Sequence, residues 1–227
     1  MNAWDNIYPR YLQVGESALL LEFAEEMTPT SNAWVRAVDI RMQELPMEGV
    51  IEWIPAYASL LIKYDPVKAK SSGVQRWLST CLKSASMEAP GKARYITIPV
   101  RYGGSEGPDL EAVADFHGLS PSEVVARHTR MTYRVGMMGF TPGFAYLMGL
   151  ETILATPRRE TPRILVPAGS VGIAGMQTGI YPLDSPGGWQ LIGRTDKALF
   201  IPDQEPPFLL APGDEVQFAA LKDGEVS

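Results

Sequence analysis

The sequence predicts a mixed α+β protein with two domains. A small N-terminal α/β sandwich of the ferredoxin-like kind is expected over residues 1–90, and a β-barrel domain over residues 91–227. A length of 227 residues suits one large domain or two small ones. Residues 136–213 hold 12 Gly and 10 Pro, whereas the preceding 135 residues hold only 8 Gly and 9 Pro. Short segments separated by Gly and Pro turns are typical of a barrel or a sandwich.

The N-terminal domain is predicted from apolar runs and from helical spacing. Strand-like runs cover Ser17–Phe23, Val50–Ile54 and Ser59–Tyr64. Thr30 and Ser31 are candidate N-caps of a first helix. The apolar face of that helix consists of Trp34, Val38, Met42 and Leu45. A second helix is expected over Val67–Ser84, and Ser84–Lys92 has the composition of a linker.

The second domain is predicted to begin with a strand and two short helices. Tyr95–Tyr102 alternates like a strand, and a helix is expected from Pro108 to Phe116. Ser120, Pro121 and Glu123 have the pattern of a capping box, which begins a helix that reaches about His128. The later predicted strands are Tyr133–Met138, Arg163–Val166, Val171–Ile173, Trp189–Ile192, Leu199–Ile201 and Glu215–Phe218.

The composition argues against several classes of protein. A formal net charge of −6 disfavours a nucleic-acid partner, which requires a basic surface. No apolar run reaches the roughly 18–20 residues that span a bilayer, and no secretory signal is visible, so we expect a cytoplasmic protein that does not act on membranes. Cys81 is the only cysteine, and the chain has only two histidines, so we expect neither a disulfide nor a metal site.

Arginines are the first candidate binding groups. Seven lie in the C-terminal half, namely Arg127, Arg130, Arg134, Arg158, Arg159, Arg163 and Arg194. Arginine binds carboxylate or phosphate through two parallel hydrogen bonds. For Arg127 and Arg130 we favour simple surface charge, because they flank a helix end. For Arg158, Arg159 and Arg163, which lie among prolines, the sequence leaves ligand binding and surface charge equally open.

The glycine-rich segment Val166–Thr195 is the second candidate. Its glycines would let the backbone approach a ligand, and its side chains Ser170, Gln177, Thr178, Tyr181, Ser185 and Gln190 can form hydrogen bonds. The alternative is a barrel whose corners require glycine. His128 can titrate near neutrality, but a structural role near a helix end is equally open. Asp109, Glu111 and Asp115 are expected on a solvated helix face.

Three stretches carry a family resemblance. They read IPVRYGGSEGPDLEAVA, HTRMTYRVGMMGFTPGFAYLMGL and TPRRETPRILVPAGSVGIAGMQTGIYPLDSPGGWQLIGRTD. From Tyr95 onward the chain strongly resembles the family of the 5-oxoprolinase B subunit, the kinase inhibitor KipI and allophanate hydrolase subunit 1, whose domain is named after carboxyltransferase subdomains C and D. Two positions depart from the usual pattern: Ala145 replaces a proline in GFTPGFAYL, and Met176 lies within the IAGxQTG loop.

The resemblance implies a fold, an activity and partners. It implies a cyclophilin-like β-barrel after the N-terminal domain, and 5-oxoprolinase subunits C and A as partners that complete an ATP-dependent enzyme. That enzyme converts 5-oxo-L-proline to L-glutamate. We expect the chain to be inactive alone, since it has no phosphate-loop motif. Inhibition of a sensor histidine kinase, or a place in a urea or allophanate pathway, remains an alternative.

The resemblance also directs the roles that we expect of the candidate residues. Arg158, Arg159, Arg163 and Arg194 would hold the carboxylate or phosphate of a small-molecule substrate. Ser170, Gln177, Tyr181, Ser185 and Gln190 would orient it, and His128 would transfer a proton. An apolar interface for the partner C subunit would include some of Phe140, Phe144, Tyr146 and Trp189, unless these side chains belong to the core.

Overall fold

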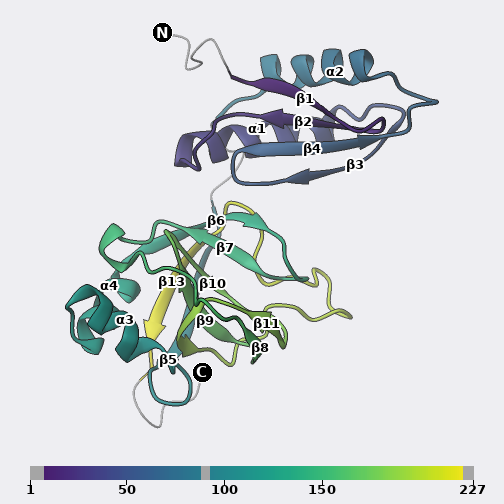
Figure 1. Ribbon diagram of the computed structural model, residues 1–227. Coiled ribbons are helices and arrows are strands. Elements are labelled where there is room, and N and C mark those ends of the chain that lie inside the picture. Colours follow the sequence, from purple (N-terminus) through teal and green to yellow (C-terminus); the bar gives the residue numbers. More distant parts are fainter. Residues whose placement is uncertain (1–7, 88–92, 222–227) are drawn as a thin grey trace. The chain divides into compact units, whose positions relative to one another are not determined.

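The computed structural model describes residues 8–87 and 93–221. The chain divides into two compact units, Met1–Lys92 and Ala93–Ser227, each with a hydrophobic core of its own (Figure 1). The predicted linker Ser84–Lys92 falls partly outside the described residues. Within the described ranges, no helix combines the length and the apolar character that a membrane crossing requires.

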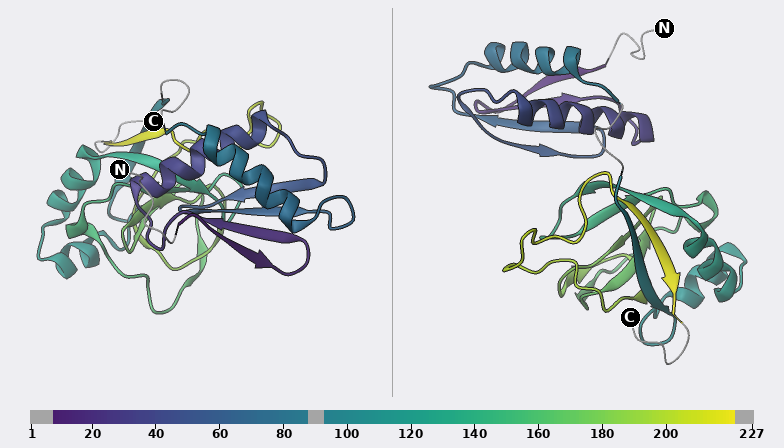
Figure 2. Two further views of the ribbon diagram at one scale, coloured as in Figure 1. Left: turned by 90° about the horizontal axis from the view of Figure 1, so that it is seen from above. Right: turned by 180° about the vertical axis from the view of Figure 1, so that it is seen from behind.

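The N-terminal unit is a four-stranded antiparallel sheet with two helices. Its elements are β1 (Arg10–Val14), β2 (Ala18–Glu22), α1 (Pro29–Glu44), β3 (Val50–Pro55), β4 (Ser59–Tyr64) and α2 (Ser71–Ser84). The strand order is β1-β2-β4-β3. Both helices lie over the same face of the sheet (Figure 2), and α1 and α2 bury Val38, Met42 and Leu78 against it. The Cys81 thiol is buried in this core, which raises its pKa.

The connectivity differs from the predicted ferredoxin-like pattern. A ferredoxin-like unit runs βαββαβ, whereas this unit runs ββαββα. The additional strand β1 pairs with β2 at the sheet edge, so the edge strand precedes the first helix and none follows α2. The sequence pattern missed β1 because an edge strand is half exposed and Gln13 interrupts its apolar residues.

Two helix starts in the N-terminal unit were predicted at the wrong residue. The N-cap of α1 is Thr28 rather than Thr30 or Ser31, because Pro29 occupies the first turn and Ser31 completes a capping box with Thr28. Helix α2 begins at Ser71 rather than Val67. The Val67 N–H donates instead to Asp65 Oδ1 over 2.9 Å, which keeps this segment in a turn.

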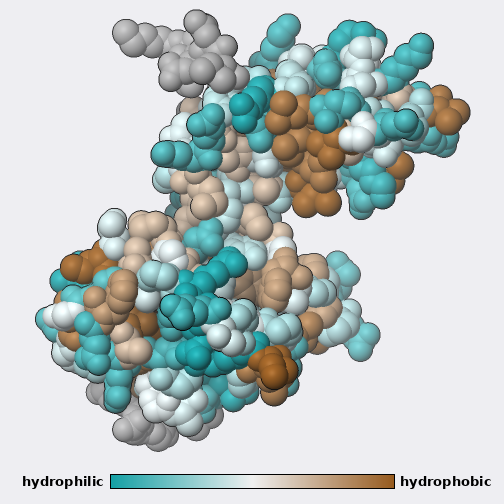
Figure 3. All heavy atoms as spheres, in the orientation of Figure 1, coloured by the Kyte–Doolittle hydropathy of each residue, from teal (hydrophilic) through white to brown (hydrophobic). Residues whose placement is uncertain are grey.

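The face of the sheet opposite the helices carries an apolar row. Paired positions across all four strands form this row, which consists of Leu12, Leu20, Leu61 and Ile54. Ion pairs lie in the rows on either side, between Arg10 and Glu22 and between Lys63 and Glu52. Figure 3 shows apolar side chains gathered over the strands of this unit.

The C-terminal unit is built on a closed barrel, which confirms the predicted barrel. The strands follow the order β10-β7-β6-β13-β5-β12-β9, and β11 pairs with β8 in a separate ribbon. Among the described strands, β5 and β13 are the only parallel neighbours. The elements are β5 (Tyr95–Tyr102), α3 (Leu110–His117), α4 (Pro121–Arg130), β6 (Thr132–Met138), β7 (Ala145–Met148), the short helix η1 (Thr152–Leu154), β8 (Arg163–Val166), β9 (Ser170–Ala174), β10 (Gln177–Ile180), β11 (Ser185–Gly187), β12 (Gln190–Arg194) and β13 (Glu215–Ala220).

Most glycines of the segment 166–195 lie in or beside strands. A Cβ atom on Gly193 would lie 2.7 Å from the Arg101 carbonyl oxygen, and one on Gly179 would lie 3.0 Å from that of Ala145. These glycines therefore allow neighbouring strands to approach, which agrees with their alternative interpretation as barrel corners. The predicted strand Leu199–Ile201 is wrong, because this segment forms only an isolated bridge between Phe200 and Phe208.

Replacement of Gly107 tests the close packing before α3. A Cβ atom there would lie 2.1 Å from the Ile192 carbonyl oxygen. We expect Gly107→Ala to lower the free energy of unfolding by about 1–3 kcal/mol. The control is Gly73→Ala, since Gly73 lies in α2 with only ordinary contacts, and alanine in a helix should raise stability by about 0.5–1 kcal/mol. Urea unfolding followed by circular dichroism measures both, and equal effects would contradict the prediction.

Candidate functional site

Asp109, the residue before α3, is the polar centre of the candidate site, because its carboxylate joins this helix to the loop 157–163 and to strand β12. Its Oδ1 accepts hydrogen bonds from Arg163 Nη2 over 2.7 Å and from Arg159 Nη1 over 3.2 Å. Its Oδ2 accepts one from the Leu191 N–H over 2.6 Å. The expected solvated position is therefore wrong for Asp109, which is only 5% exposed, although Glu111 and Asp115 are exposed as predicted. The carboxylate of Asp109 binds β12 and two arginines instead of capping α3.

Further hydrogen bonds attach the loop 157–163 to the start of β12. The Arg159 N–H donates to the Gly188 carbonyl over 2.8 Å, and Gln190 Nε2 donates to the Pro157 carbonyl over 3.0 Å. The Asp109 N–H also donates to the Leu191 carbonyl over 2.9 Å. The loop that carries Arg158 is thereby held against the strand that follows Trp189.

A small cavity lies beside this attachment, and its volume is about 240 Å³. Its lining residues are Phe140, Phe144, Tyr146, Arg158, Pro162, Tyr181, Pro186, Gly187, Gly188 and Trp189. The rings meet edge to face, with centroids 5.5 Å apart for Phe144 and Trp189 and 5.2 Å apart for Phe144 and Tyr181. A Cβ atom on Gly187 would lie 2.4 Å from the Tyr181 hydroxyl, so only glycine fits there.

The cavity combines one cation with two neutral hydroxyl groups. Arg158 is exposed, and among the described residues no carboxylate pairs with it. Burial raises the pKa of Tyr146 and of Tyr181. The opposing charge of Arg158 only partly offsets this effect for Tyr146, and a hydrogen bond from the Trp189 backbone together with the charge of Arg158 only partly offsets it for Tyr181. Both phenols therefore stay protonated at neutral pH. Such a cavity suits a small anion with an apolar body and a hydrogen-bond acceptor.

The predicted site residues are only partly brought together. Of the nine binding candidates, Arg158 and Tyr181 line the small cavity. The other seven do not line it. Arg159 and Arg163 bind Asp109, and Gln190 binds the Pro157 carbonyl. Arg194 donates to the Ala168 carbonyl over 2.8 Å and lies 3.7 Å from Glu106, whereas Ser170 and Ser185 are buried and Gln177 begins β10.

The aromatic walls of the small cavity were not predicted as part of a ligand site. Phe144 and Trp189 are buried, as the core interpretation proposed, while Phe140 is exposed. All three line the small cavity. The signal that was available is their position beside the glycines and prolines of the GFTPGFAYL and SPGGWQ stretches.

A larger cavity of about 750 Å³ lies on the other side of Phe140. Among the described residues that line it, Arg94 is the single charged one. The Arg94 guanidinium is already bound to Asp214, with Nε donating to Oδ1 over 2.9 Å, and it also donates to the Leu209 carbonyl. The small cavity, with its unpaired cation, is therefore the better candidate for binding a charged ligand.

His128 lies in the barrel core rather than in either cavity. Thr178 Oγ1 donates to the Gly172 carbonyl, so it accepts from His128 Nε2 over 2.9 Å, and the Tyr102 hydroxyl donates to Nδ1 over 2.7 Å. Complete burial lowers the pKa of His128 to about 3. These contacts favour the structural alternative over proton transfer.

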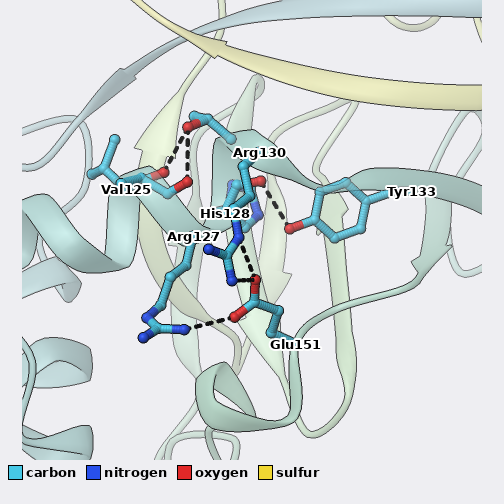
Figure 4. A network of polar contacts seen from close by, with 8 residues as sticks. Val125, Arg127, His128, Arg130, Tyr133 and Glu151 are labelled. Atoms are coloured by element: carbon cyan, nitrogen blue, oxygen red, sulfur yellow. Dashed lines mark hydrogen bonds and ion pairs between the residues drawn. The ribbon is translucent and has the colours of Figure 1, made fainter.

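Arg127 and Arg130, the arginines beside His128, form ion pairs, which agrees with their interpretation as surface charge. Arg127 Nη1 and Arg130 Nε each lie 2.8 Å from an oxygen of Glu151 (Figure 4). Desolvation opposes ionisation of Glu151, but the hydrogen bonds from Arg130 and Arg127 outweigh it and lower the pKa of the carboxyl. In residues 8–87 and 93–221, no cluster of three or more His, Cys, Asp or Glu side chains could hold a metal ion.

Replacement of Asp109 by asparagine tests this polar centre. The side-chain NH₂ of the asparagine would face either the Leu191 N–H or the two guanidinium groups, so a donor would meet a donor. We expect Asp109→Asn to lower the free energy of unfolding by about 2–3 kcal/mol, whereas Asp115→Asn on the exposed face should change it by less than about 0.5 kcal/mol. Urea unfolding measures both, and similar effects of the two variants would contradict the assignment.

The two histidines should titrate differently. We expect the ring of His128 to stay neutral from pH 8 to pH 5, while His117, whose pKa is also lowered by burial, becomes protonated at a higher pH than His128. Because the folded pKa of His128 lies below its value of about 6.5 in an unfolded chain, its stabilising effect is complete above pH 6.5 and is lost toward pH 3. Ring proton chemical shifts, assigned with His117→Gln, measure this, and titration of His128 near pH 6 would contradict it.

Comparisons with known proteins agree with the resemblance seen in the sequence. Residues 9–210 match the family described as carboxyltransferase domain, subdomain C and D. The chain is 43% identical over 221 residues to the B subunit of 5-oxoprolinase from Bacillus subtilis (strain 168), covering 93% of this chain and 92% of that protein. It is 44% identical over 212 residues to the B subunit of 5-oxoprolinase from Escherichia coli O157:H7, covering 93% and 95%.

The fold also matches a solved structure. The crystal structure of TTHA0988 is similar with a TM-score of 0.79 and 41% sequence identity over 90% of this chain. The chain spans only 40% of that longer protein. With a family match over most of its length and relatives of more than 40% identity, the chain belongs to the family of the carboxyltransferase domain, subdomain C and D.

Proposed function

We propose that this chain is the B subunit of an ATP-dependent 5-oxoprolinase and that its small cavity binds 5-oxo-L-proline. The observation that carries the proposal is Arg158, which has no carboxylate partner among the described residues and lines an aromatic cavity of about 240 Å³. This cavity occurs in a chain that is 43–44% identical to two proteins named as B subunits of 5-oxoprolinase. We further propose that the protein acts in the cytoplasm.

The chemistry of the substrate matches the cavity. 5-Oxo-L-proline has a carboxylate, a compact ring with apolar methylene groups, and a lactam carbonyl. Arg158 would bind the carboxylate, and the faces of Phe144 and Trp189 would contact the methylene groups. The protonated phenols of Tyr146 and Tyr181 would donate hydrogen bonds to the lactam oxygen. These donors would stabilise the negative charge that develops on this oxygen when the carbonyl carbon is attacked.

The remaining chemistry would be shared with partner subunits. Hydrolysis would break the bond between the lactam carbonyl carbon and the nitrogen; the oxygen of one water would enter the new carboxylate, and the nitrogen would take up protons and become an ammonium group. A second water would convert ATP to ADP and phosphate, which drives the reaction. Among the described residues that line the small cavity there is neither a carboxylate nor an imidazole. We therefore propose that subunits A and C supply the group that transfers protons. A nucleoside triphosphate exceeds this cavity in size, so we place the ATP site elsewhere in the complex.

Replacement of Arg158 tests the proposal in a complex reconstituted with subunits A and C. We expect Arg158→Gln to raise KM for 5-oxo-L-proline by about 10- to 100-fold, because the substrate carboxylate loses a charged hydrogen-bond donor. The matched control is Arg134→Gln, because Arg134 is exposed and bound to Glu215 over 3.0 Å, away from the cavity. ATP-dependent formation of L-glutamate is measured.

Two results would contradict the proposal. One is the absence of 5-oxo-L-proline turnover when both partner subunits and ATP are present. The other is an equal KM for Arg158→Gln and Arg134→Gln, which would show that Arg158 does not bind the substrate.

A further inference from the structure

Phe140 has an unusual backbone conformation. Its φ is +70°, and the Thr141 N–H donates to the Gly139 carbonyl over 2.9 Å. This hydrogen bond joins residues two apart, so Phe140 is the central residue of a γ-turn with positive φ, the rarer and more strained of the two γ-turn forms. Positive φ is a true outlier for a bulky side chain.

The rest of the described chain uses glycine for this conformation. Eleven described residues have positive φ; ten of them are glycines and Phe140 is the exception. Glycine at this position would relieve the strain, since it has no Cβ atom. The phenylalanine side chain therefore brings a steric strain that another interaction has to offset.

Burial does not offset this strain, because the Phe140 side chain is 59% exposed. The ring contacts Phe144 and Tyr181 edge to face, with centroid distances of 5.5 and 6.3 Å. It is the most exposed of the rings that line the small cavity, and Phe140 also lines the larger cavity. Strained backbone conformations cluster at ligand-binding sites. An exposed apolar ring on a strained turn beside a cavity is therefore a candidate for covering a ligand.

We propose that Phe140 determines the specificity of the small cavity by covering the apolar edge of a bound cyclic carboxylate. The inference rests on the proposed function and adds a residue to it. The strained turn holds the ring over the opening, so the ring limits the size of the ligand that fits between it and Trp189. Ligand contact with the ring offsets the strain in the bound state.

The test compares Phe140→Ala with Phe140→Gly in the reconstituted complex. Both variants remove the ring, but only glycine relieves the backbone strain. We expect both to raise KM for 5-oxo-L-proline by roughly tenfold, with a smaller change in kcat. The six-membered-ring homologue of the substrate, 6-oxopiperidine-2-carboxylate, should gain in kcat/KM relative to 5-oxo-L-proline. The control is Phe116→Ala, because Phe116 is similarly exposed, at 62%, and does not line the small cavity.

The melting temperature is the second measurement, because a purely structural role of Phe140 predicts a different change in it. We expect Phe140→Gly to melt about 2–4 °C above Phe140→Ala, and not below the wild type. Greater stability of Phe140→Gly together with weaker binding of 5-oxo-L-proline would show that the strain at Phe140 is linked to ligand binding.

The possible results separate this inference from the proposed function. If both Phe140 variants keep KM within twofold of the wild type while Arg158→Gln raises it, Phe140 does not cover the ligand and the proposed function stands. If both variants lower the melting temperature by more than about 5 °C, the ring is a packing element and the inference fails. If the wild-type complex does not turn over 5-oxo-L-proline, both fail together.

Discussion

The surroundings of the candidate site depend on the hydrogen bonds that the buried carboxylate of Asp109 accepts. It accepts hydrogen bonds from Arg159, Arg163 and the Leu191 N–H, and so joins the N-terminus of α3, the loop 157–163 and strand β12. An isolated carboxylate at this depth would be unfavourable, and the two guanidinium groups make its burial possible. The position of Arg158 on one side and of Trp189 on the other follows from this attachment.

The arginines of this domain differ in whether they have a carboxylate partner. Arg159 and Arg163 share the Asp109 carboxylate as an ion-pair partner, and Arg127 and Arg130 share that of Glu151. Arg158 lies next to Arg159 in the sequence but has no carboxylate partner among the described residues. Its charge acts on the phenols of the cavity instead. If a ligand anion binds there as proposed, the aromatic walls would strengthen its interactions by lowering the local dielectric constant.

Sequence patterns predicted local structure well where the signal was local. Strand β5 and the capping box of Ser120 and Glu123 were predicted at the right residues, because alternation and capping depend on near neighbours. Strands β1, β7, β10 and β11 were missed, since β1 is a half-exposed edge strand and the other three are only three or four residues long. The exposed position expected for Asp109 was wrong because its three partners lie 50–82 residues away in the chain.

The class of the fold, the family and the concentration of glycine and proline in residues 136–213 were already evident in the linear sequence. Helical spacing, alternation and motif order are properties of near neighbours along the chain, so they can be read without a structure. Which arginine remains unpaired, and which aromatic rings surround a cavity, became clear only in the folded protein. Both depend on contacts made when the barrel closes and brings the loop 157–163 to β12. The strain at Phe140 was likewise invisible in the sequence, because a positive φ is set by the turn in which the residue is held.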